Sequence, residues 1–357
     1  MIFTGINLEN YRNVSFDKVS FKGRDQFLVG RNGQGKTNLL EALSLITSLR
    51  SFRTNKQKNL IGSEKDYSGI YYHIVHERLG ELNVELKIKS KGKEIFVNGE
   101  AVKRQSEIIG DFPVVVFSSL DFELIRGTPS GRRGYVDQFV CSLNGQYFDA
   151  LRRYHQALDQ RNILLKSNGS IPEMEAFEQI MAVNALFIIS QRRQMIHELG
   201  AILSETYQRM SESEEVPRLI FQPNLEAENV EEILGCLSNG RERDRIMKAT
   251  SRGPHKDEYL FMLNGRLAKE IASEGQQRSL VSALKLGQIE IMKQKTNVSP
   301  VILADDVVNE LDSGRRELFW HHLNQNYQII ATGTDRPAKT PLDWNYFSVE
   351  KGRFHQL

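Results

Sequence analysis

The 357-residue sequence has only two cysteines, Cys141 and Cys236, and they do not form a ligand-spaced pair. A reducing cytosol is the simplest setting for such a chain. No apolar run approaches the roughly 20 residues that a membrane span needs. The first residues lack the charged and apolar regions of a signal peptide. We therefore expect a cytoplasmic protein with no membrane partner.

A strong net charge, internal repeats and low-complexity tracts are also missing from the sequence. The formal net charge is +2, which neither requires nor excludes nucleic acid, because local patches matter more than the sum. Hydrophobic residues make up 40% and charged residues 26% of the chain, and these fractions are typical of a soluble globular protein. A chain of this length is expected to form about two domains.

A glycine-rich stretch near the N-terminus carries the strongest motif. Residues 30–37, GRNGQGKT, match the P-loop pattern G-x-x-x-x-G-K-[ST]. An apolar strand precedes the motif and leucines follow it at helical spacing, which argues against a glycine-rich loop that matches by chance. In a P-loop, backbone N–H groups and the helix N-terminus face phosphate oxygens. The motif therefore predicts nucleotide binding, with Mg²⁺ as a cofactor.

The polar residues of the motif have expected roles. Lys36 is expected to contact the β- and γ-phosphates and to act in catalysis, and Thr37 to offer its hydroxyl to Mg²⁺. The remaining predicted nucleotide-binding residues of this region are Arg12, Gly30, Asn32, Gly33, Gln34, Gly35 and Asn38. The basic segment 50–54, RSFRT, is either a solvated loop or a further phosphate contact.

Hydrophobic periodicity divides the chain into three parts. From 67 to 103 apolar residues alternate, which is typical of antiparallel strands with one solvated face. Strand signals disappear between 125 and 245, where helical spacing predominates and Gly200 is a candidate break. Further strands are expected at 2–8, 16–21, 114–117, 259–263, 300–304, 327–331 and 346–349, and helices at 36–49, 147–158, 174–210, 230–237 and 280–295.

These patterns predict an α/β fold in which a helical lobe interrupts an ATPase head. Residues 1–124 and 246–357 would form the head, with mixed sheets, and residues 125–245 would form the inserted, mainly helical lobe. No sustained heptad run is present in the lobe, so a long coiled coil is excluded there.

A second motif, VILADD, covers residues 301–306. An apolar strand delivers two carboxylates at its C-terminal end, where ligands bind in open α/β sheets. Asp305 is placed to hold Mg²⁺, directly or through water. Asp306 would face an attacking water as a catalytic residue. Alone this pattern is weak, but together with a P-loop it is strong.

A third motif, ASEGQQ at residues 272–277, resembles the signature of ABC-type ATPases. In that signature a Ser and a Gly at a helix start grip the γ-phosphate of a nucleotide bound to the opposite subunit, so Ser273, Gly275 and Gln276 join the predicted nucleotide-binding set. The alternative is that Ser273 is an ordinary helix cap. Residues 309–312, NELD, match the loop that follows the second carboxylate in ABC-type heads.

The chain resembles the RecF family of bacterial recombination-repair ATPases over essentially its whole length. The resemblance rests on residues 10–13, 30–37, 50–53, 129–137, 160–162, 253–257, 273–276 and 305–312. Transporter subunits have a much shorter gap between the P-loop lysine and the signature serine. The chain departs from the ABC pattern by carrying Asp306 where transporters have Glu. It also has Thr332 or Thr334, in place of a histidine, as the candidate γ-phosphate contact and catalytic residue.

The resemblance implies an ATP-dependent DNA-binding protein of recombinational repair, replication and SOS induction. It would bind double-stranded and gapped DNA as an ATP-closed homodimer with weak DNA-dependent ATPase activity, and RecR and RecO would help to load the recombinase. Basic residues of the lobe are candidate DNA contacts or members of a solvated face: Arg126, Arg132, Arg133, Arg152, Arg153, Arg161, Lys166, Arg192 and Arg193. A transporter motor subunit and a non-hydrolysing nucleotide switch remain as alternatives.

Overall fold

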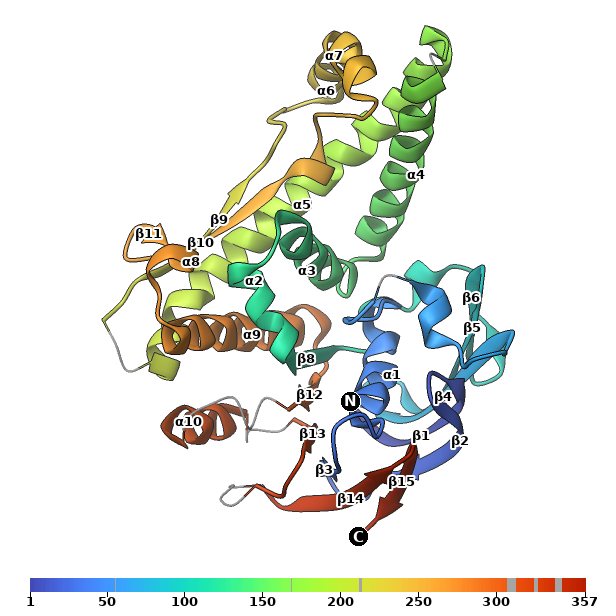
Figure 1. The fold of residues 1–357 in the computed structure, drawn as a ribbon, viewed down its shortest axis with the longest axis vertical. Helices are drawn as coiled ribbons and strands as arrows, with labels where there is room; N and C mark the ends of the chain where they lie inside the picture. The colour runs from blue at the N-terminus through green and yellow to red at the C-terminus, as the bar shows by residue number, and fades with distance from the viewer. Residues whose placement is uncertain (55, 168, 212–213, 307–312, 324–326, 338–341) are drawn as a thin grey trace. The chain divides into compact units, whose positions relative to one another are not determined.

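The computed structural model describes residues 1–54, 56–167, 169–211, 214–306, 313–323, 327–337 and 342–357. The chain forms two compact units, which are coloured along the sequence in Figure 1. The first contains Met1–Phe122, Thr206–Ser213 and Glu274–Leu357, and the second contains Glu123–Glu205 and Glu214–Ser273. The three-part division with boundaries at 124 and 245 remains a prediction.

A mainly parallel sheet positions the chemistry of the first unit. Its strand order is β15-β14-β3-β13-β12-β8, and β15 alone among these pairs antiparallel. The strands are β3 (Asp25–Val29), β8 (Val114–Ser118), β12 (Val301–Asp305), β13 (Ile329–Gly333), β14 (Trp344–Glu350) and β15 (Arg353–Gln356). Val301 to Ala304 are all buried, because helices or a second sheet cover both faces of a parallel sheet.

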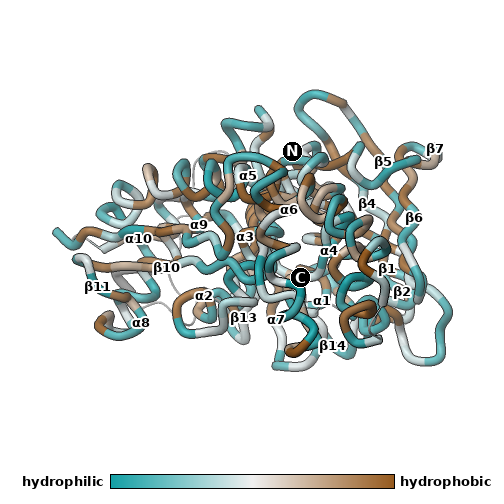
Figure 2. Tube along the Cα trace, turned by 90° about the horizontal axis from the view of Figure 1, so that it is seen from above, coloured by the Kyte–Doolittle hydropathy of each residue, from teal (hydrophilic) through white to brown (hydrophobic). Residues whose placement is uncertain are grey.

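An antiparallel sheet completes the first unit, in the order β2-β1-β4-β5-β6-β7. The strands are β1 (Ile2–Tyr11), β2 (Val14–Ser20), β4 (Tyr67–His76), β5 (Gly80–Lys89), β6 (Gly92–Val97) and β7 (Glu100–Ala101). Buried and exposed residues alternate along β5, and hydrophobic and hydrophilic segments alternate around β4, β5 and β6 in Figure 2. Asn98 and Gly99 have φ of 50° and 86°, the positive values that a tight two-residue hairpin turn requires.

Helix α1 (Lys36–Ser48) packs between these two sheets. Its leucines share one hydrophobic core with residues of both sheets, and the Tyr72 hydroxyl donates to the Ala42 carbonyl at 2.7 Å. The other helical elements of this unit are η1 (Gln57–Leu60), η2 (Gln105–Glu107), η3 (Ser119–Phe122), α9 (Glu274–Thr296) and α10 (Ser313–Leu323). The burial of α1 fixes the helix start that follows the P-loop.

The second unit is mainly helical. Its helical elements are α2 (Glu123–Arg126), α3 (Pro129–Cys141), α4 (Gly145–Ser167), most of α5 (Ile171–Ser211), α6 (Val230–Asn239), α7 (Arg241–Met247), η4 (Pro254–Lys256) and α8 (Ala268–Ile271). Helix α5 continues through Gly200, so the predicted candidate break there is wrong.

The second unit also contains a sheet, in the order β11-β10-β9. Its strands are β9 (Pro217–Gln222), β10 (Glu258–Leu263) and β11 (Arg266–Leu267). Strand β9 corrects the expectation that strands are missing before residue 245. Its alternating run is short, and it is stabilised by pairing with β10 from Gln222↔Glu258 to Pro217↔Leu263. Such pairing between distant segments is invisible in a local pattern.

Arg132, Arg161 and Arg192, which the sequence indicated as candidate DNA contacts, are buried and form ion pairs. Arg161 donates to Asp244 at 2.7 Å and to Glu178 at 3.0 Å. Arg192 donates to Asp137 and Asp257, each at 2.7 Å, and Arg132 pairs with Glu258. A charge that is already neutralised and removed from solvent is not available to a DNA phosphate. The predictions for Arg132, Arg161 and Arg192 are therefore wrong.

His255 lies in the predicted family stretch 253–257 and has both ring nitrogens engaged. Nε2 is 2.9 Å from the Thr250 carbonyl and Nδ1 is 2.7 Å from the Tyr154 hydroxyl. The contacts fit a neutral imidazole that donates to Thr250 and accepts from Tyr154. Burial is the main cause that lowers the pKa of His255 from 6.5 to about 4, and the nearby Lys256 adds to it.

We expect His255 to make the protein less stable in acid. Between pH 6.5 and 4 the unfolded chain binds the proton that the folded chain excludes, so the free energy of unfolding falls as the pH falls. The contribution of this residue is about 3 kcal/mol over that window. In urea unfolding at pH 7 and pH 4.5, His255→Gln should lose less stability on acidification than the parent. An identical loss in both proteins would contradict the assignment.

Candidate nucleotide site

The candidate site lies at the carboxyl edge of the parallel sheet. Strands β3, β13 and β12 are adjacent and parallel. The P-loop, which follows β3, therefore meets Thr332 at the end of β13 and Asp305 at the end of β12. The Gly30 amide donates to the Gly333 carbonyl at 3.3 Å. Ligands of open α/β sheets bind at this edge.

Close backbone packing shapes the P-loop. Gly33 and Gly35 have φ of 79° and 114°, in the region that favours glycine. A Cβ on Gly30 would lie 2.6 Å from the Val349 carbonyl oxygen. The turn between β14 and β15 supports the loop from outside, because the amides of Lys351 and Gly352 donate to the side chain and backbone of Gln34, both at 2.8 Å.

The Lys36 side chain is folded over the loop. It is only 4% exposed, and its Nζ donates to the carbonyls of Gly30 at 2.5 Å and Arg31 at 3.3 Å. The ammonium group thus lies at the N-terminus of α1, where the helix dipole also favours anions.

Asp305 accepts hydrogen bonds from two threonine hydroxyl groups of the site. Its Oδ1 accepts from Thr37 Oγ1 at 2.9 Å and from Thr332 Oγ1 at 3.0 Å. Burial raises the pKa of Asp305 and so does the neighbouring Asp306, while the two hydroxyl bonds act in the opposite direction. The sequence predicted Thr37 and Asp305 as ligands of one Mg²⁺, and the two side chains are in contact. It did not predict that Thr332 would contact Asp305.

Asp306 is held in an unusual conformation. Its φ is 54°, a left-handed value that is uncommon outside glycine, and its amide donates to Thr332 Oγ1 at 3.0 Å. Its Oδ1 is buried and has no hydrogen-bond partner among the described residues. Thr334 is exposed and its hydroxyl donates to Asp335. Thr332, rather than Thr334, thus lies against both carboxylate residues.

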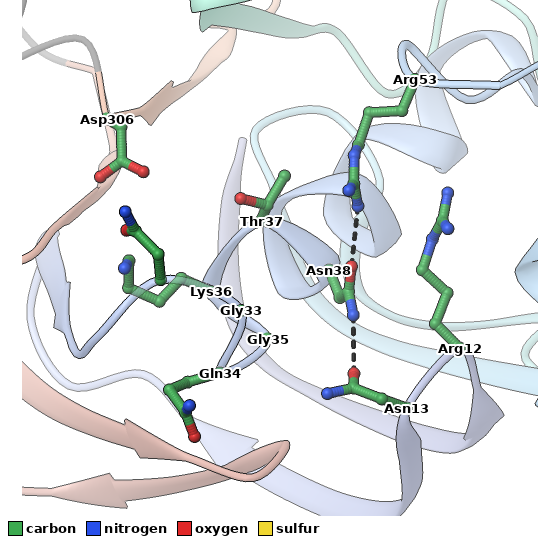
Figure 3. Close-up of a pocket in the computed structure, with 11 residues that line it drawn as sticks. Arg12, Asn13, Gly33, Gln34, Gly35, Lys36, Thr37, Asn38, Arg53 and Asp306 are labelled. Atoms are coloured by element: carbon green, nitrogen blue, oxygen red, sulfur yellow. Dashed lines mark hydrogen bonds between the residues drawn. The ribbon is translucent and has the colours of Figure 1, made fainter.

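A pocket of about 460 Å³ opens beside these groups (Figure 3). Arg53 donates to the Asn38 side chain at 2.7 Å, and Asn38 donates to Asn13 at 2.6 Å. The lining residues are Arg12, Asn13, Asn32, Gly33, Gln34, Gly35, Lys36, Thr37, Asn38, Arg53 and Asp306. The pocket thus brings together most of the predicted nucleotide-binding residues, and it adds Asn13 and Arg53.

The signature residues lie elsewhere in the chain. Ser273 is exposed and directly precedes α9, and Gly275 and Gln276 are half-buried in its first turn. None of the three lines the pocket. The predicted NELD loop, residues 309–312, lies outside the described residues. The trans role of the signature remains a prediction.

Sequence reasoning missed Glu41, a fully buried carboxylate on α1. It is hydrogen-bonded to Tyr11, Arg12 and Ser51. The available signal was an acidic residue among the leucines of a buried helix, since buried carboxylates are rare unless paired. For Arg53 the signal was the basic segment 50–54, whose composition fits either a solvated loop or a phosphate contact.

Comparison with known proteins identifies the family. Residues 2–340 match the family model described as RecF/RecN/SMC N terminal domain. A protein of Alkaliphilus oremlandii called DNA replication and repair protein RecF is 31% identical over 99% of this chain and 100% of its own length. One from Thermosynechococcus vestitus with the same name is 34% identical over 94% of this chain and 91% of its own length. The chain belongs to the RecF family.

Solved structures agree with this membership. The structure described as the recombination mediator protein RecF-ATPrS in the RecFOR pathway has a TM-score of 0.89 at 30% identity, covering 99% of this chain and 98% of its own. An SMC head bound to the C-winged helix domain of ScpA, with a TM-score of 0.53 and 15% identity over 100% of this chain and 98% of its own, shares the fold. The prediction of an ABC-type ATPase head with mixed sheets is confirmed, and RecF-family membership removes the transporter alternative.

Two structural features are absent from the described part of this RecF-family chain. None of its described helices combines the length and the apolar character that crossing a membrane requires. Among the same residues, no three His, Cys, Asp or Glu side chains gather closely enough to hold a metal ion. Mg²⁺ sites of nucleotide enzymes commonly use one or two protein ligands together with phosphates and water. The Thr37–Asp305 pair is therefore the candidate set of protein ligands for Mg²⁺.

Proposed function

We propose that this chain is an ATP-dependent DNA-binding protein of recombinational repair and replication restart. The observation that carries the proposal is one pocket in which the P-loop, Asp306 and two arginines converge. The relatives are named for DNA replication and repair, and a related structure is described as RecF with ATP. ATP is the ligand that we assign to this pocket.

Different residues of the pocket would contact different parts of a bound triphosphate and its Mg²⁺. The amides of the P-loop and the N-terminus of α1 face the phosphates. Lys36 exchanges its carbonyl partners for the β- and γ-phosphates, and Arg12 and Arg53, which line the same pocket, contact the phosphates as well. The hydroxyl of Thr37 and the carboxylate of Asp305 are oxygen donors of the kind that Mg²⁺ prefers. Bound Mg²⁺ would neutralise phosphate charge.

Asp306 is the proposed base for the attacking water. Its buried, unpartnered Oδ1 is an acceptor that a water molecule can satisfy. Thr332 fixes the backbone of Asp306 and the carboxylate of Asp305 at once, and so it acts as a positioning residue. Hydrolysis would be slow, because aspartate reaches less far than the glutamate of transporters. A nucleotide switch without turnover remains the alternative.

We expect Asp306→Asn to slow ATP hydrolysis by at least about a hundredfold while ATP affinity stays within about threefold of the parent. The variant removes a proton acceptor but no phosphate contact. Single-turnover hydrolysis and equilibrium binding on the same preparation would show this. A parent that does not hydrolyse ATP at all would establish the switch alternative, and lost ATP binding in a folded variant would give Asp306 a structural role.

Two copies would close on two nucleotides, with Ser273 and Gly275 of each chain facing the γ-phosphate held by the other. The closed homodimer would bind double-stranded and gapped DNA, and RecR- and RecO-type proteins would join it to load recombinase. Exposed or half-exposed basic residues of the second unit supply the phosphate contacts: Arg126, Arg133, Arg152, Arg153, Lys166 and Arg193.

The experiment that tests this function is a DNA-binding titration in defined salt. Fluorescence anisotropy with a gapped duplex, a blunt duplex and single-stranded DNA would be recorded with ATP, with ADP and without nucleotide. We expect ATP to raise duplex affinity at least about tenfold over ADP, because only the closed dimer offers both sets of basic residues. Equal affinities in all three states would refute ATP-dependent DNA binding.

A further inference from the structure

Glu41 connects two segments that are far apart in the sequence. Its side chain is fully buried on α1. It accepts hydrogen bonds from the Tyr11 hydroxyl at 2.8 Å and from Arg12 Nη2 at 2.6 Å, as well as from Arg12 Nε and Ser51 Oγ. Arg53 Nη1 lies 3.7 Å from its Oε2. One carboxylate thus holds groups from the end of β1 and from the loop after α1.

Glu41 contacts both segments at points where the backbone turns sharply. Arg12 has a φ of 52°, in the left-handed region where a side chain costs energy. Ser51 Oγ donates to Glu41 and accepts from the amides of Arg53 at 2.9 Å and Thr54 at 3.1 Å. The turn that carries Arg53 is therefore built on a hydroxyl that Glu41 holds.

Arg12 and Arg53 differ in how strongly they interact with Glu41. Arg12 makes a two-pronged bond to Glu41 and its side chain is 18% exposed. Burial opposes its charge, but the bonds to Glu41 outweigh this and raise the pKa of Arg12. Arg53 has a longer ion pair, a side chain 33% exposed and a hydrogen bond to Asn38. Arg12 is fixed, whereas Arg53 can exchange partners at small cost.

We propose that Glu41 is a positioning residue that holds Arg12 and Arg53 against the phosphates of a nucleotide in this pocket. Both arginines line the pocket and Glu41 does not, so the carboxylate acts through them. It also cancels one of the two positive charges, which keeps the pair close together in a partly buried site. The inference rests on the proposed function, because it assumes that the pocket binds ATP.

A double-mutant cycle on ATP affinity tests the inference. Glu41→Gln keeps the shape and one acceptor oxygen but removes the charge. We expect it to weaken ATP binding about tenfold in the parent and by less than about twofold in the Arg12→Ala/Arg53→Ala background, where the groups that it positions are gone. An equal loss in both backgrounds would show a purely structural role and overturn the proposal, and so would unchanged affinity in the parent.

Further variants keep the result interpretable. Tyr72→Phe removes another buried hydrogen bond to α1, the one to Ala42, and should leave ATP affinity within about twofold. If Glu41→Gln does not fold, Ser51→Ala replaces it: the loss should vanish in an Arg53→Ala background, and a persistent loss would contradict the inference. Lys36→Met separates the two claims. If it binds ATP normally, the proposed nucleotide site fails; if it loses ATP while Glu41→Gln does not, the role of Glu41 fails.

Discussion

Replacing Lys36 with Met is expected to lower ATP affinity by about a hundredfold or more. The residue is the one cation that lies over the P-loop carbonyls among the described pocket residues, at the positive end of α1. Its exchange of carbonyl partners for phosphate oxygens is a charge-assisted interaction in a largely buried place. Equilibrium binding of a fluorescent ATP analogue measures the loss.

Asp305→Asn should act differently at the same site. It would leave the proposed phosphate contacts in place but remove the charge of a proposed Mg²⁺ ligand, so the Mg²⁺ dependence of binding should weaken and turnover should stop. Lys91→Met is the matched control, because Lys91 is exposed and does not line the pocket. If Lys36→Met and Asp305→Asn both bind and hydrolyse ATP like the Lys91→Met protein, the site assignment is wrong.

Replacing Ser273 with Arg is expected to abolish ATP-dependent dimerisation while ATP still binds. Ser273 is exposed at the start of α9 and lies outside the pocket of its own chain. In one chain the signature would have no phosphate to hold, since residues 30–37 would already surround the one that we assign to the pocket. In the proposed dimer a second copy would supply that phosphate, and a two-fold arrangement would satisfy both signatures. A bulky arginine would obstruct the approach of the facing nucleotide.

Nucleotide affinity and sedimentation on one preparation decide this prediction. The expected result is parental ATP affinity, a monomer with ATP and no stimulation of DNA binding. Ser238→Arg is the matched control, because Ser238 is an exposed helical serine outside the signature. A Ser273→Arg protein that dimerises normally with ATP would leave Ser273 as a helix cap.

The sequence predicted those parts of the site that local patterns encode. The P-loop spacing identified Lys36 and Thr37, and the apolar run before Asp305 identified a buried strand. Each of these patterns is typical of one local structure. Parallel strands also align their carboxyl ends, so the meeting of Thr37 with Asp305 followed from two motifs. The helix at 280–295 was predicted for the same reason and is α9.

Other features depend on contacts between distant segments. The hydrogen bonds of Glu41 join residues 11, 12 and 51. The P-loop residue Gln34 accepts hydrogen bonds from the amides of Lys351 and Gly352. Neither contact leaves a periodic trace in the sequence. Arg161 and Arg192 illustrate the opposite error, because a helical arginine looks solvated until the carboxylates that bury it are located. Burial and pairing are tertiary properties.

Sedimentation velocity of the purified chain tests the central claim most directly. The same preparation would be run without nucleotide, with ADP and with ATP, each with Mg²⁺ and with or without gapped duplex DNA. In the proposed closed dimer the γ-phosphate would bridge the two copies. The account therefore predicts a dimer with ATP, a lower dimer fraction with ADP or no nucleotide, and DNA that co-sediments with the ATP-bound dimer. The same monomer–dimer distribution in all nucleotide states, with DNA binding unaffected, would contradict it.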